Sequence, residues 1–336
     1  MQIQKALVLG MARSGAAAAR LLLARGCEVT ICDVKPREQF AGALDDLDVP
    51  GVHWHLGEED PLPLIEGMDA LIVSPGIPDT HPAVVRAREL GVEVMGELEY
   101  AYRESTGTLL AVTGTNGKTT TSTLLGEIFK NAGRRTWVVG NIGAPYAQAV
   151  LKMRAGDVTV CEVSSFQLET VSQFHPAVAA VLNVTEDHLN RHGTMENYIA
   201  LKERVFANCR EGDFVVLNYD NAVTRAMSAH TRARVVWFSR SGEAPSGALA
   251  RDGKVVFVDD EGTRPVCDTS EIYIPGPHNL ENALAATAMA LSAGVPAPVV
   301  RHTLRAFQGV EHRLEFVREL DQVRYINDSK GTNVDS

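Results

Sequence analysis

The sequence predicts an α/β fold. We expect a Rossmann-like parallel-sheet domain, then a central P-loop α/β domain of the ATPase type, with a C-terminal α/β domain only begun. Two observations carry this prediction: an apolar run ends in a glycine turn at Gly10, and a second one, residues 109–113, enters a glycine-bearing turn and a helix-like segment that contains Lys118. Each resembles the opening strand, turn and helix of a nucleotide-binding sheet. The expected domains are residues 1–97, 98–310 and 311–336.

The first of these runs predicts a βαβ unit. Residues 5–10 have the pattern of a buried parallel strand, residues 16–25 that of a helix, and residues 27–33 that of a second strand. The glycine fingerprint is imperfect, because Ala12 stands at its second glycine position. Asp33 ends the second strand, where an acidic residue meets a ribose in dinucleotide enzymes. From these residues alone, a tight turn with a helix cap explains the pattern as well as a ligand site does.

The rest of the first domain is expected to complete its sheet. Residues 69–77 predict a strand that runs into a Ser74-Pro75-Gly76 turn, at the strand end where open α/β sheets bind ligands. Residues 91–96 predict a short closing strand, and residues 97–103 a helix. A domain boundary is expected close behind.

The second turn has the pattern of a phosphate-binding loop. Gly114 to Thr119 read G-x-x-G-K-T, a short variant with Val112 where the longer loop has its first glycine. Backbone N–H groups and the following helix N-terminus favour anionic oxygens. Lys118 adds a positive charge for the β- and γ-phosphates, and the Thr119 hydroxyl reaches Mg²⁺. The alternative is a strand–turn–helix junction whose lysine is solvated.

Two later strand ends add candidate magnesium ligands. Residues 157–162 predict a strand that ends at Glu162, where phosphate-binding domains place a carboxylate for Mg²⁺. A solvated strand-end acid is the alternative. Residues 176–182 predict another strand, and five ionisable groups follow it within residues 186–192. This density of charge favours a metal and phosphate site.

The last third contains fewer signals of function. A helix is expected over residues 195–208, on which Lys202 by itself reads as a surface lysine. The strands expected next are residues 214–218 and 234–238, and residues 240–267 read as a peripheral hairpin. The turn from Pro275 to Asn279 opens an alanine-rich helix, and polar side chains at such a helix start can bind a base or a ribose.

Composition limits the classes of function. The chain has 336 residues, 45% hydrophobic and 22% charged, as expected for a soluble protein of two or three domains. The formal charge of −10 argues against a nucleic-acid or membrane-surface binder. Five scattered cysteines indicate neither a disulfide framework nor a zinc site and favour a reduced cytoplasm. No signal peptide or membrane-spanning run is apparent, so we expect a cytoplasmic protein without membrane insertion.

Six motifs, in this order, resemble the ATP-dependent Mur ligases of peptidoglycan synthesis: GTNGKTTT, EVSSFQL, NVTEDHLNRHG, GPHNLENALAA, EHRLE and INDSKGTN. The resemblance covers essentially the whole chain. It is strongest to the members that add D-glutamate to UDP-N-acetylmuramoyl-L-alanine, since alanine-adding members typically carry His where Asn116 stands. It implies an acyl-phosphate mechanism, ATP and two Mg²⁺ ions as cofactors, these two substrates as partners, and a monomer.

The resemblance also assigns residues to the parts of a site. The implied nucleotide-binding residues are Gly114, Thr115, Asn116, Gly117, Lys118, Thr119, Thr120, Asn279, Arg313 and Asp328. The implied substrate-binding residues are Met11, Ala12, Arg13, Asp33, Ser74, Pro75, Gly76, Asn141, Lys330 and Thr332. The implied metal ligands are Thr119, Glu162, His188 and Lys202, the last as a carbamate. The implied catalytic residues are Lys118, Glu162, His188 and Lys202.

Other functions stay open at this point. An NAD-dependent oxidoreductase would use the Gly10 turn and Asp33, but it leaves the Lys118 loop unexplained. A non-catalytic ATP-binding module would keep the loop and need neither Glu162 nor His188. Another Mur-type ligase or a folylpolyglutamate-type ligase is a further alternative.

The position of the last motif adds an expectation about activity. Family members carry a third α/β domain after the EHRLE segment, whereas about 25 residues follow Glu311 here. An independent domain typically needs about 100 residues. We therefore expect the UDP-substrate site and the phosphate loop to be retained, and ligation by the 336-residue chain to be severely impaired.

Overall fold

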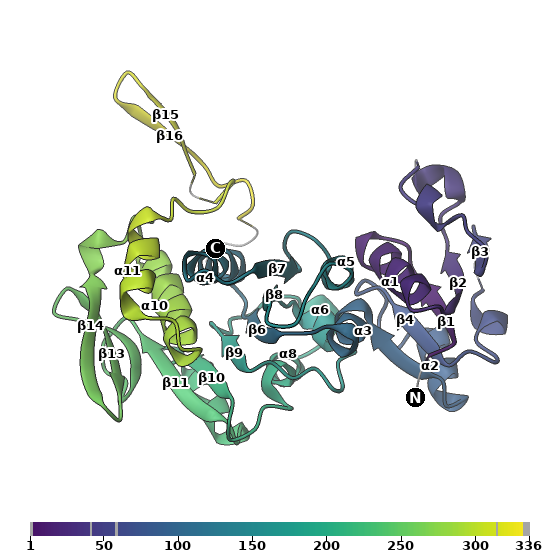
Figure 1. Ribbon diagram of the computed structural model, residues 1–336, viewed down its shortest axis with the longest axis horizontal. Coiled ribbons are helices and arrows are strands. Elements are labelled where there is room, and N and C mark those ends of the chain that lie inside the picture. Colours follow the sequence, from purple (N-terminus) through teal and green to yellow (C-terminus); the bar gives the residue numbers. More distant parts are fainter. Residues whose placement is uncertain (1–2, 41, 58–59, 314, 332–336) are drawn as a thin grey trace. The chain divides into compact units, whose positions relative to one another are not determined.

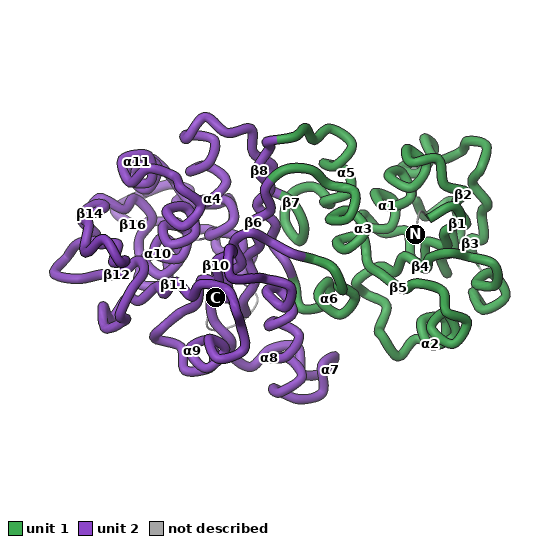
Figure 2. The backbone as a smooth tube through the Cα atoms, turned by 60° about the horizontal axis from the view of Figure 1, so that its bottom comes forward, with its two compact units in different colours: residues 1–107, 139–155, 164–174 green, residues 108–138, 156–163, 175–336 purple. Residues whose placement is uncertain are grey.

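The computed structural model describes residues 3–40, 42–57, 60–313 and 315–331, which form two compact units (Figure 2). Unit 1 consists of residues 1–107, 139–155 and 164–174, and unit 2 of residues 108–138, 156–163 and 175–336. The chain therefore returns to unit 1 twice after leaving it. The sequence-based division at residue 97 does not include these returns, and it stays a prediction.

Unit 1 is built on a five-stranded sheet with the order β3-β2-β1-β4-β5, in which all neighbours are parallel (Figure 1). The strands are β1 (Lys5–Leu9), β2 (Glu28–Asp33), β3 (Val52–Leu56), β4 (Ala70–Val73) and β5 (Glu93–Gly96). This is the predicted Rossmann-like sheet. Strand β3 was not expected, because its Val-His-Trp-His-Leu sequence is only half-buried at the sheet edge and lacks the apolar run of the central strands.

The α-helices in the described part of unit 1 are α1 (Arg13–Ala24), α2 (Pro82–Glu89), α3 (Glu97–Glu104), α5 (Tyr146–Val150) and α6 (Ser165–Leu168). Helix α1 packs against α3 and α5. Its buried face is made largely of alanines, from Ala16 to Ala19, together with Leu21 and Leu22. Small side chains let a helix lie close to its neighbours, so α1 can begin directly behind the Gly10 turn.

Unit 2 is built on a nine-stranded sheet with the order β14-β13-β12-β11-β10-β9-β6-β8-β7, whose last strand ends in residues 139–140 of unit 1. Its strands are β6 (Thr108–Thr113), β7 (Thr136–Gly140), β8 (Val158–Glu162), β9 (Val178–Val181), β10 (Phe214–Asn218), β11 (Arg234–Ser239), β12 (Gly247–Arg251), β13 (Lys254–Asp259) and β14 (Gly262–Asp268). Strands β11, β10, β9, β6 and β8 run parallel. The predicted central α/β domain is therefore present.

The expected peripheral hairpin at residues 240–267 is present, because β12, β13 and β14 form antiparallel hairpins at one edge of the sheet, with β13 as the inner strand. Strands β12, β13 and β14 extend the main sheet, because β12 pairs in parallel with β11 before the chain turns antiparallel. A Cβ atom at Gly247 would lie 1.8 Å from the Trp237 carbonyl oxygen. Only glycine therefore allows the β12 backbone to approach β11 this closely.

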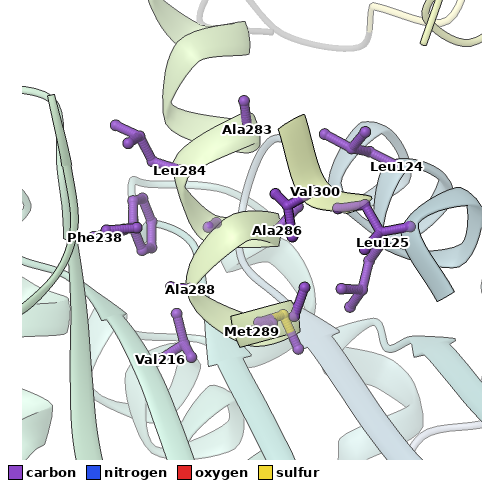
Figure 3. Close-up of a cluster of buried hydrophobic side chains, with 14 of the residues drawn as sticks. Leu124, Leu125, Val216, Phe238, Ala283, Leu284, Ala286, Ala288, Met289 and Val300 are labelled. Carbon is purple, nitrogen blue, oxygen red and sulfur yellow. The ribbon is translucent and has the colours of Figure 1, made fainter. Parts of the chain in front are cut away.

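The helices of unit 2 enclose its core. They are α4 (Lys118–Asn131), α7 (Leu189–His192), α8 (Met195–Glu203), α9 (Ala222–Ala226), α10 (Pro277–Ser292) and α11 (Ala297–Ala306). Helix α10 packs against strands β10 and β11 and against α4. Figure 3 shows Val216 and Phe238 on one side of α10, and Leu124 and Leu125 on the other. Because α10 is buried on both sides, its start is fixed beside the turn that precedes α4.

After α11 the chain forms a separate two-stranded antiparallel sheet of β15 (Glu315–Leu320) and β16 (Val323–Asn327) (Figure 1). The expected domain boundary at residue 311 stays a prediction, because residues 175–336 are assigned to unit 2 as a whole. No helix among the described residues is both long enough and apolar enough to cross a membrane.

Candidate functional site

The turn between β6 and α4 has the backbone of a phosphate-binding loop. Gly114 and Gly117 have φ angles of 150° and 83°, which favour glycine. The Thr115 N–H donates to the Asn183 carbonyl at 2.9 Å, and the Asn116 N–H to the Asn183 side-chain oxygen at 2.8 Å. The loop is thus held against the end of β9. The amides that open α4 lack partners within the helix and are the available anion donors.

Lys118 is folded back onto the loop that carries it. Its Nζ donates to the carbonyl oxygens of Gly114, at 3.0 Å, and Thr115, at 2.8 Å. Burial lowers the pKa of Lys118, while the negative charge of Glu162 opposes that shift. A lysine held by two neutral carbonyls in a buried site can exchange them for phosphate oxygens, which carry full charge. The solvated-lysine alternative does not fit this arrangement.

Lys202 lies at the same loop, and the reading of it as a surface lysine is wrong. Its side chain is 1% exposed, and its Nζ donates to the Gly114 carbonyl at 2.9 Å. The Nζ also lies 4.4 Å from the centroid of the Tyr198 ring. Burial, and then the charge of Lys118, lower the pKa of Lys202 well below its usual value. The sequence of α8 does not indicate that Lys202 is buried, because the helix has no clear apolar face.

Glu162 ends β8 beside the loop. It is 1% exposed and pairs in register with Val112 of β6. The solvated-acid alternative is therefore wrong. The Thr119 hydroxyl, on the first turn of α4, accepts a hydrogen bond from Arg313 Nη2 at 3.4 Å. Glu162 and Thr119 supply the hard oxygen donors that Mg²⁺ prefers.

The charged stretch after β9 is less concentrated than its sequence predicts. His192 is buried and stacks on Tyr198, with ring centroids 5.4 Å apart. Glu186 and His188 are exposed, and the His188 Nδ1 lies 3.6 Å from the Asp187 carboxylate. Among the described residues, no three His, Cys, Asp or Glu side chains group as metal ligands.

A cavity of about 360 Å³ opens beside the loop, entirely within unit 2. It brings together predicted nucleotide-binding residues from distant parts of the sequence, namely Asn116, Gly117, Thr120, Asn279, Arg313 and Asp328. His278, from the turn expected to bind a base or a ribose, lines it too, as do side chains that were not predicted, among them Asn183, Asp220, Arg240, Glu281 and Asn282. The spacing of Asn282, one helical turn after Asn279, is a signal that could have identified it.

Two residues show how the cavity is prepared for a ligand. Arg313 Nε is buried and has no hydrogen-bond partner among the described residues. Such an atom carries a desolvation cost that an anionic ligand can offset. Asn279 donates to the Pro275 carbonyl at 2.8 Å, and its oxygen accepts from Asn282 at 3.2 Å. The cavity thus has a cationic end at Arg313 and an ordered amide pair at the start of α10.

The predicted substrate residues of unit 1 meet at a change of strand order. Strands β2 and β3 lie on one side of β1, and β4 and β5 lie on the other. The order in which strands join the sheet therefore changes side at β1, and ligands of open α/β sheets bind at such a point. The turns after β1 and β4 touch, because Ser74 Oγ donates to the Gly10 carbonyl at 2.7 Å. A Cβ atom at Gly15 would lie 1.9 Å from the Gly10 carbonyl oxygen, so a residue with a side chain does not fit at position 15. The neighbouring Pro75 and Gly76 continue the second turn.

Asp33 organises the first of these turns. Its carboxylate accepts the N–H of Met11 at 2.6 Å and that of Lys35 at 2.9 Å. The next residues of the turn are Ala12, which precedes α1, and Arg13, which starts it. Arg13 donates to the Gly143 carbonyl, in the turn that carries Asn141. The structure therefore brings the Arg13 and Asn141 turns together within unit 1.

The two remaining predicted residues lie near the end of the chain. Lys330 is exposed, and its N–H donates to the His312 carbonyl at 3.2 Å. It does not line the cavity, although Asp328 does. Thr332 lies outside the described residues.

Comparison with known proteins identifies the family. Residues 112–290 match the Mur ligase middle domain, and residues 4–96 match the MurD-like N-terminal domain of Mur ligases. The chain belongs to the Mur ligase family. It is 49% identical over 333 residues to the UDP-N-acetylmuramoylalanine–D-glutamate ligase of Pelotomaculum thermopropionicum, covering 99% of this chain and 73% of that protein. The same-named ligase of Alkaliphilus oremlandii is 46% identical, with 98% and 73% covered.

Solved Mur ligases share the fold at low identity. The UDP-N-acetylmuramate:L-alanyl-γ-D-glutamyl-meso-diaminopimelate ligase of Neisseria meningitides aligns with a TM-score of 0.64 and 20% identity, covering 92% of this chain and 100% of that one. The UDP-N-acetylmuramate–alanine ligase of Thermotoga maritima aligns with a TM-score of 0.54 and 22% identity, covering 97% and 74%. The fold of this Mur ligase chain is therefore shared with solved members of the family.

Proposed function

We propose that this Mur ligase joins D-glutamate to UDP-N-acetylmuramoyl-L-alanine with the hydrolysis of ATP to ADP and phosphate. The observation that carries the proposal is the 49% identity, over 99% of the chain, to a ligase named for this reaction. The buried Lys118 and Lys202 at one loop support it, because an NAD-dependent oxidoreductase or a simple βα junction has no use for them. The cavity beside the loop supports the nucleotide part.

The chemistry needs two anions to meet. A carboxylate is a poor acyl donor, so the substrate carboxyl attacks the γ-phosphate and becomes an acyl phosphate, with ADP leaving. The D-glutamate amine then attacks the acyl carbon, and phosphate leaves. Two like charges at 4 Å repel by roughly 4 kcal/mol at an effective dielectric of 20. Positive groups at the meeting point are therefore required for a useful rate.

The proposed roles rest on the family resemblance, and the positions of the described side chains support part of them. Lys118 and the amides that open α4 bind the phosphates and offset the charge on the transferred group. Arg313 exchanges its weak contact with Thr119 for a phosphate oxygen, which gives its buried Nε a partner. Asn279 and Asp328 hold the nucleoside end. Asp33, Arg13 and the Ser74 turn hold the UDP moiety, with Asn141, Lys330 and Thr332 on the acyl substrate.

Magnesium fits the donor set at the loop. Thr119, Glu162 and His188 are the unmodified ligands that we propose, and two bound ions would neutralise charge on the phosphate oxygens. The Lys202 amine becomes an oxygen ligand if it adds CO₂ and releases a proton, which gives a carbamate. Burial favours this addition, because it keeps the amine neutral and nucleophilic.

Carbamylation can be tested without measuring activity. We expect a carbamate ¹³C signal after exposure to ¹³C-bicarbonate, lost in Lys202→Ala and kept in Lys152→Ala, a lysine outside the site. The same spectrum from Lys202→Ala and the parent chain would contradict the assignment.

The reaction itself is tested by ADP release. We expect it to need Mg²⁺, UDP-N-acetylmuramoyl-L-alanine and D-glutamate together, and to fail with L-glutamate. Binding of the UDP-linked substrate, titrated by calorimetry on the same preparation, separates a missing substrate site from slow turnover. Release of phosphate from ATP at a rate that depends on neither substrate would favour a different ATPase function.

Cellular setting and assembly are also proposed. All five cysteines are free thiols and buried, which suits a reducing cytoplasm. We infer a monomer, to be checked by sedimentation at several protein concentrations. A concentration-dependent mass would overturn it.

A further inference from the structure

Two buried carboxylates on α3 have no role in the proposed reaction. Glu97 and Glu99 stand in the first turn of this helix and are 2% and 0% exposed. Carboxylates are rarely buried so completely unless hydrogen bonds or opposite charges compensate them. Their partners therefore indicate what they do.

Glu97 is bound to the first segment that returns to unit 1, residues 139–155. Its Oε1 accepts the N–H of Ala147 at 2.6 Å, at the start of α5. The residue before α5 is Pro145, which provides no side-chain cap. The carboxylate of Glu97 thus caps a helix from a distant part of the sequence. Burial raises the pKa of Glu97 to about 7, and the hydrogen bonds from backbone amides at the start of α5 oppose that shift.

The turn just before α5 is the one that carries Asn141. Its Gly140 N–H donates to the Ala144 carbonyl at 3.1 Å, which closes the turn on itself. Arg13 holds the turn at the Gly143 carbonyl, and Glu97 holds the chain four residues later. The turn is therefore attached to α3 and also to the turn at residues 11–13, which we call the UDP-substrate turn because we propose that it binds the UDP moiety.

Glu99 is bound to the second returning segment, residues 164–174. Its two oxygens accept backbone N–H groups of Ser172 at 3.0 Å, Gln173 at 2.9 Å and Phe174 at 3.1 Å. Arg103, one helical turn later, donates to Glu99 at 2.7 Å and to the Ser172 hydroxyl at 2.9 Å. Three consecutive amides on one carboxylate leave that stretch of backbone little freedom.

Packing fastens the second segment to the same helix. A Cβ atom at Gly96, which precedes α3, would lie 2.5 Å from the Thr170 hydroxyl. The rings of Tyr102 and Phe174 meet edge to face, with centroids 5.5 Å apart. Both ends of α3 thus contact residues 164–174.

We propose that Glu97 and Glu99 are positioning residues that fasten segments 139–155 and 164–174 to α3. The Asn141 turn and the Ser164 to Gln167 turn are thereby held on the unit that carries the UDP-substrate turn. Glu97 fastens residues 139–155, and Glu99 fastens residues 164–174. The proposal deepens the proposed function, and only its kinetic part rests on that function.

Hydrogen exchange tests the division directly. In Glu97→Leu, we expect backbone exchange at the start of α5 to accelerate by about tenfold or more, with residues 172–174 unchanged. In Glu99→Leu, we expect the reverse pattern. Glu97→Gln keeps an acceptor oxygen at the same place and should retain most of the protection. Glu104→Gln is the matched control, since it removes a charge from the same helix where it pairs with Arg25 at the surface.

Several outcomes would overturn the proposal. Unchanged exchange at Ala147 in folded Glu97→Leu contradicts it, and so does equal acceleration of both segments in either variant. If a leucine variant fails to fold, the parent chain decides the question. The amides of Ala147, Gln173 and Phe174 must then exchange among the slowest of their segments, and fast exchange there refutes the proposal.

Kinetics separate positioning from general stability. We expect Glu97→Leu to raise KM for the UDP-linked substrate severalfold, with the affinity for Mg-ATP unchanged, because the nucleotide cavity lies in unit 2. Equal losses for both ligands would contradict a positioning role. Changed exchange together with no binding of the UDP-linked substrate by the parent chain would leave the positioning result intact and count against the proposed function.

Discussion

Replacing Gly117 with alanine tests whether the phosphate loop depends on close packing against α10. A Cβ atom at Gly117 would lie 2.2 Å from the Asn282 side-chain oxygen, and the φ angle of 83° is already unfavourable for alanine. Gly133, at the other end of α4, is the matched control. Its φ angle is 74°, but an added Cβ atom meets nothing within 4 Å.

The two variants share one energetic cost and differ in the other. A left-handed alanine costs about 1–2 kcal/mol, partly offset by the reduced freedom of the unfolded chain. Overpacking adds about 1–3 kcal/mol for Gly117→Ala alone. We therefore expect Gly117→Ala to be less stable than Gly133→Ala by about 1–3 kcal/mol. It should also bind Mg-ATP more weakly, because the loop must shift.

Urea unfolding measures this difference. In a Trp54→Phe background, the fluorescence of Trp137 and Trp237 reports on unit 2 alone. The double variant Gly117→Ala with Asn282→Ala should recover part of the loss, since the clashing oxygen is removed. Equal destabilisation by Gly117→Ala and Gly133→Ala would refute the packing argument.

Three further predictions follow from buried charges. Lys118→Met should lower the affinity for Mg-ATP by about tenfold or more in calorimetry and leave the UDP-linked substrate unaffected; equal ATP affinity would contradict its role. Arg313→Met should leave the thermal stability of the ligand-free protein unchanged or higher, because a buried Nε without a hydrogen-bond partner is removed. The same variant should be stabilised less by Mg-ATP than the parent chain is. A large loss of stability without ligand would contradict this. Glu97 has its folded pKa raised from 4.5 to about 7, so its contribution to stability is present below pH 4.5 and lost as the pH rises through about 7. At 1.36 kcal/mol per unit, Glu97→Gln should gain roughly 3 kcal/mol relative to the parent across that range in urea unfolding, and parallel pH curves would contradict it.

Local patterns predicted the central parts of both sheets. The apolar runs before Gly10 and Gly114 are buried parallel strands, and such runs are distinctive because both faces of the sheet are covered. Glycine-bearing turns at strand ends then marked the starts of α1 and α4. The edge strand β3 was missed, because a half-buried strand at a sheet edge lacks that signal.

The burial of single polar residues could not be predicted in this way. Lys202 and Glu97 lie on helices whose sequences look ordinary, and each is buried by segments far away in the chain. For Lys202, only the family resemblance indicated a role. The returns of residues 139–155 and 164–174 to unit 1 are tertiary in origin as well, since they rest on contacts to α3 that no local pattern encodes.

The central claim is that an acyl phosphate forms on the substrate carboxyl group. It is tested most directly by preparing UDP-N-acetylmuramoyl-L-alanine with ¹⁸O in its free carboxylate and measuring the mass of the phosphate released from unlabelled Mg-ATP in the presence of D-glutamate. Attack of the carboxylate on the γ-phosphate transfers one of its oxygens, so the account predicts phosphate that carries a single ¹⁸O. Phosphate without the label, released at the rate of product formation, would contradict it.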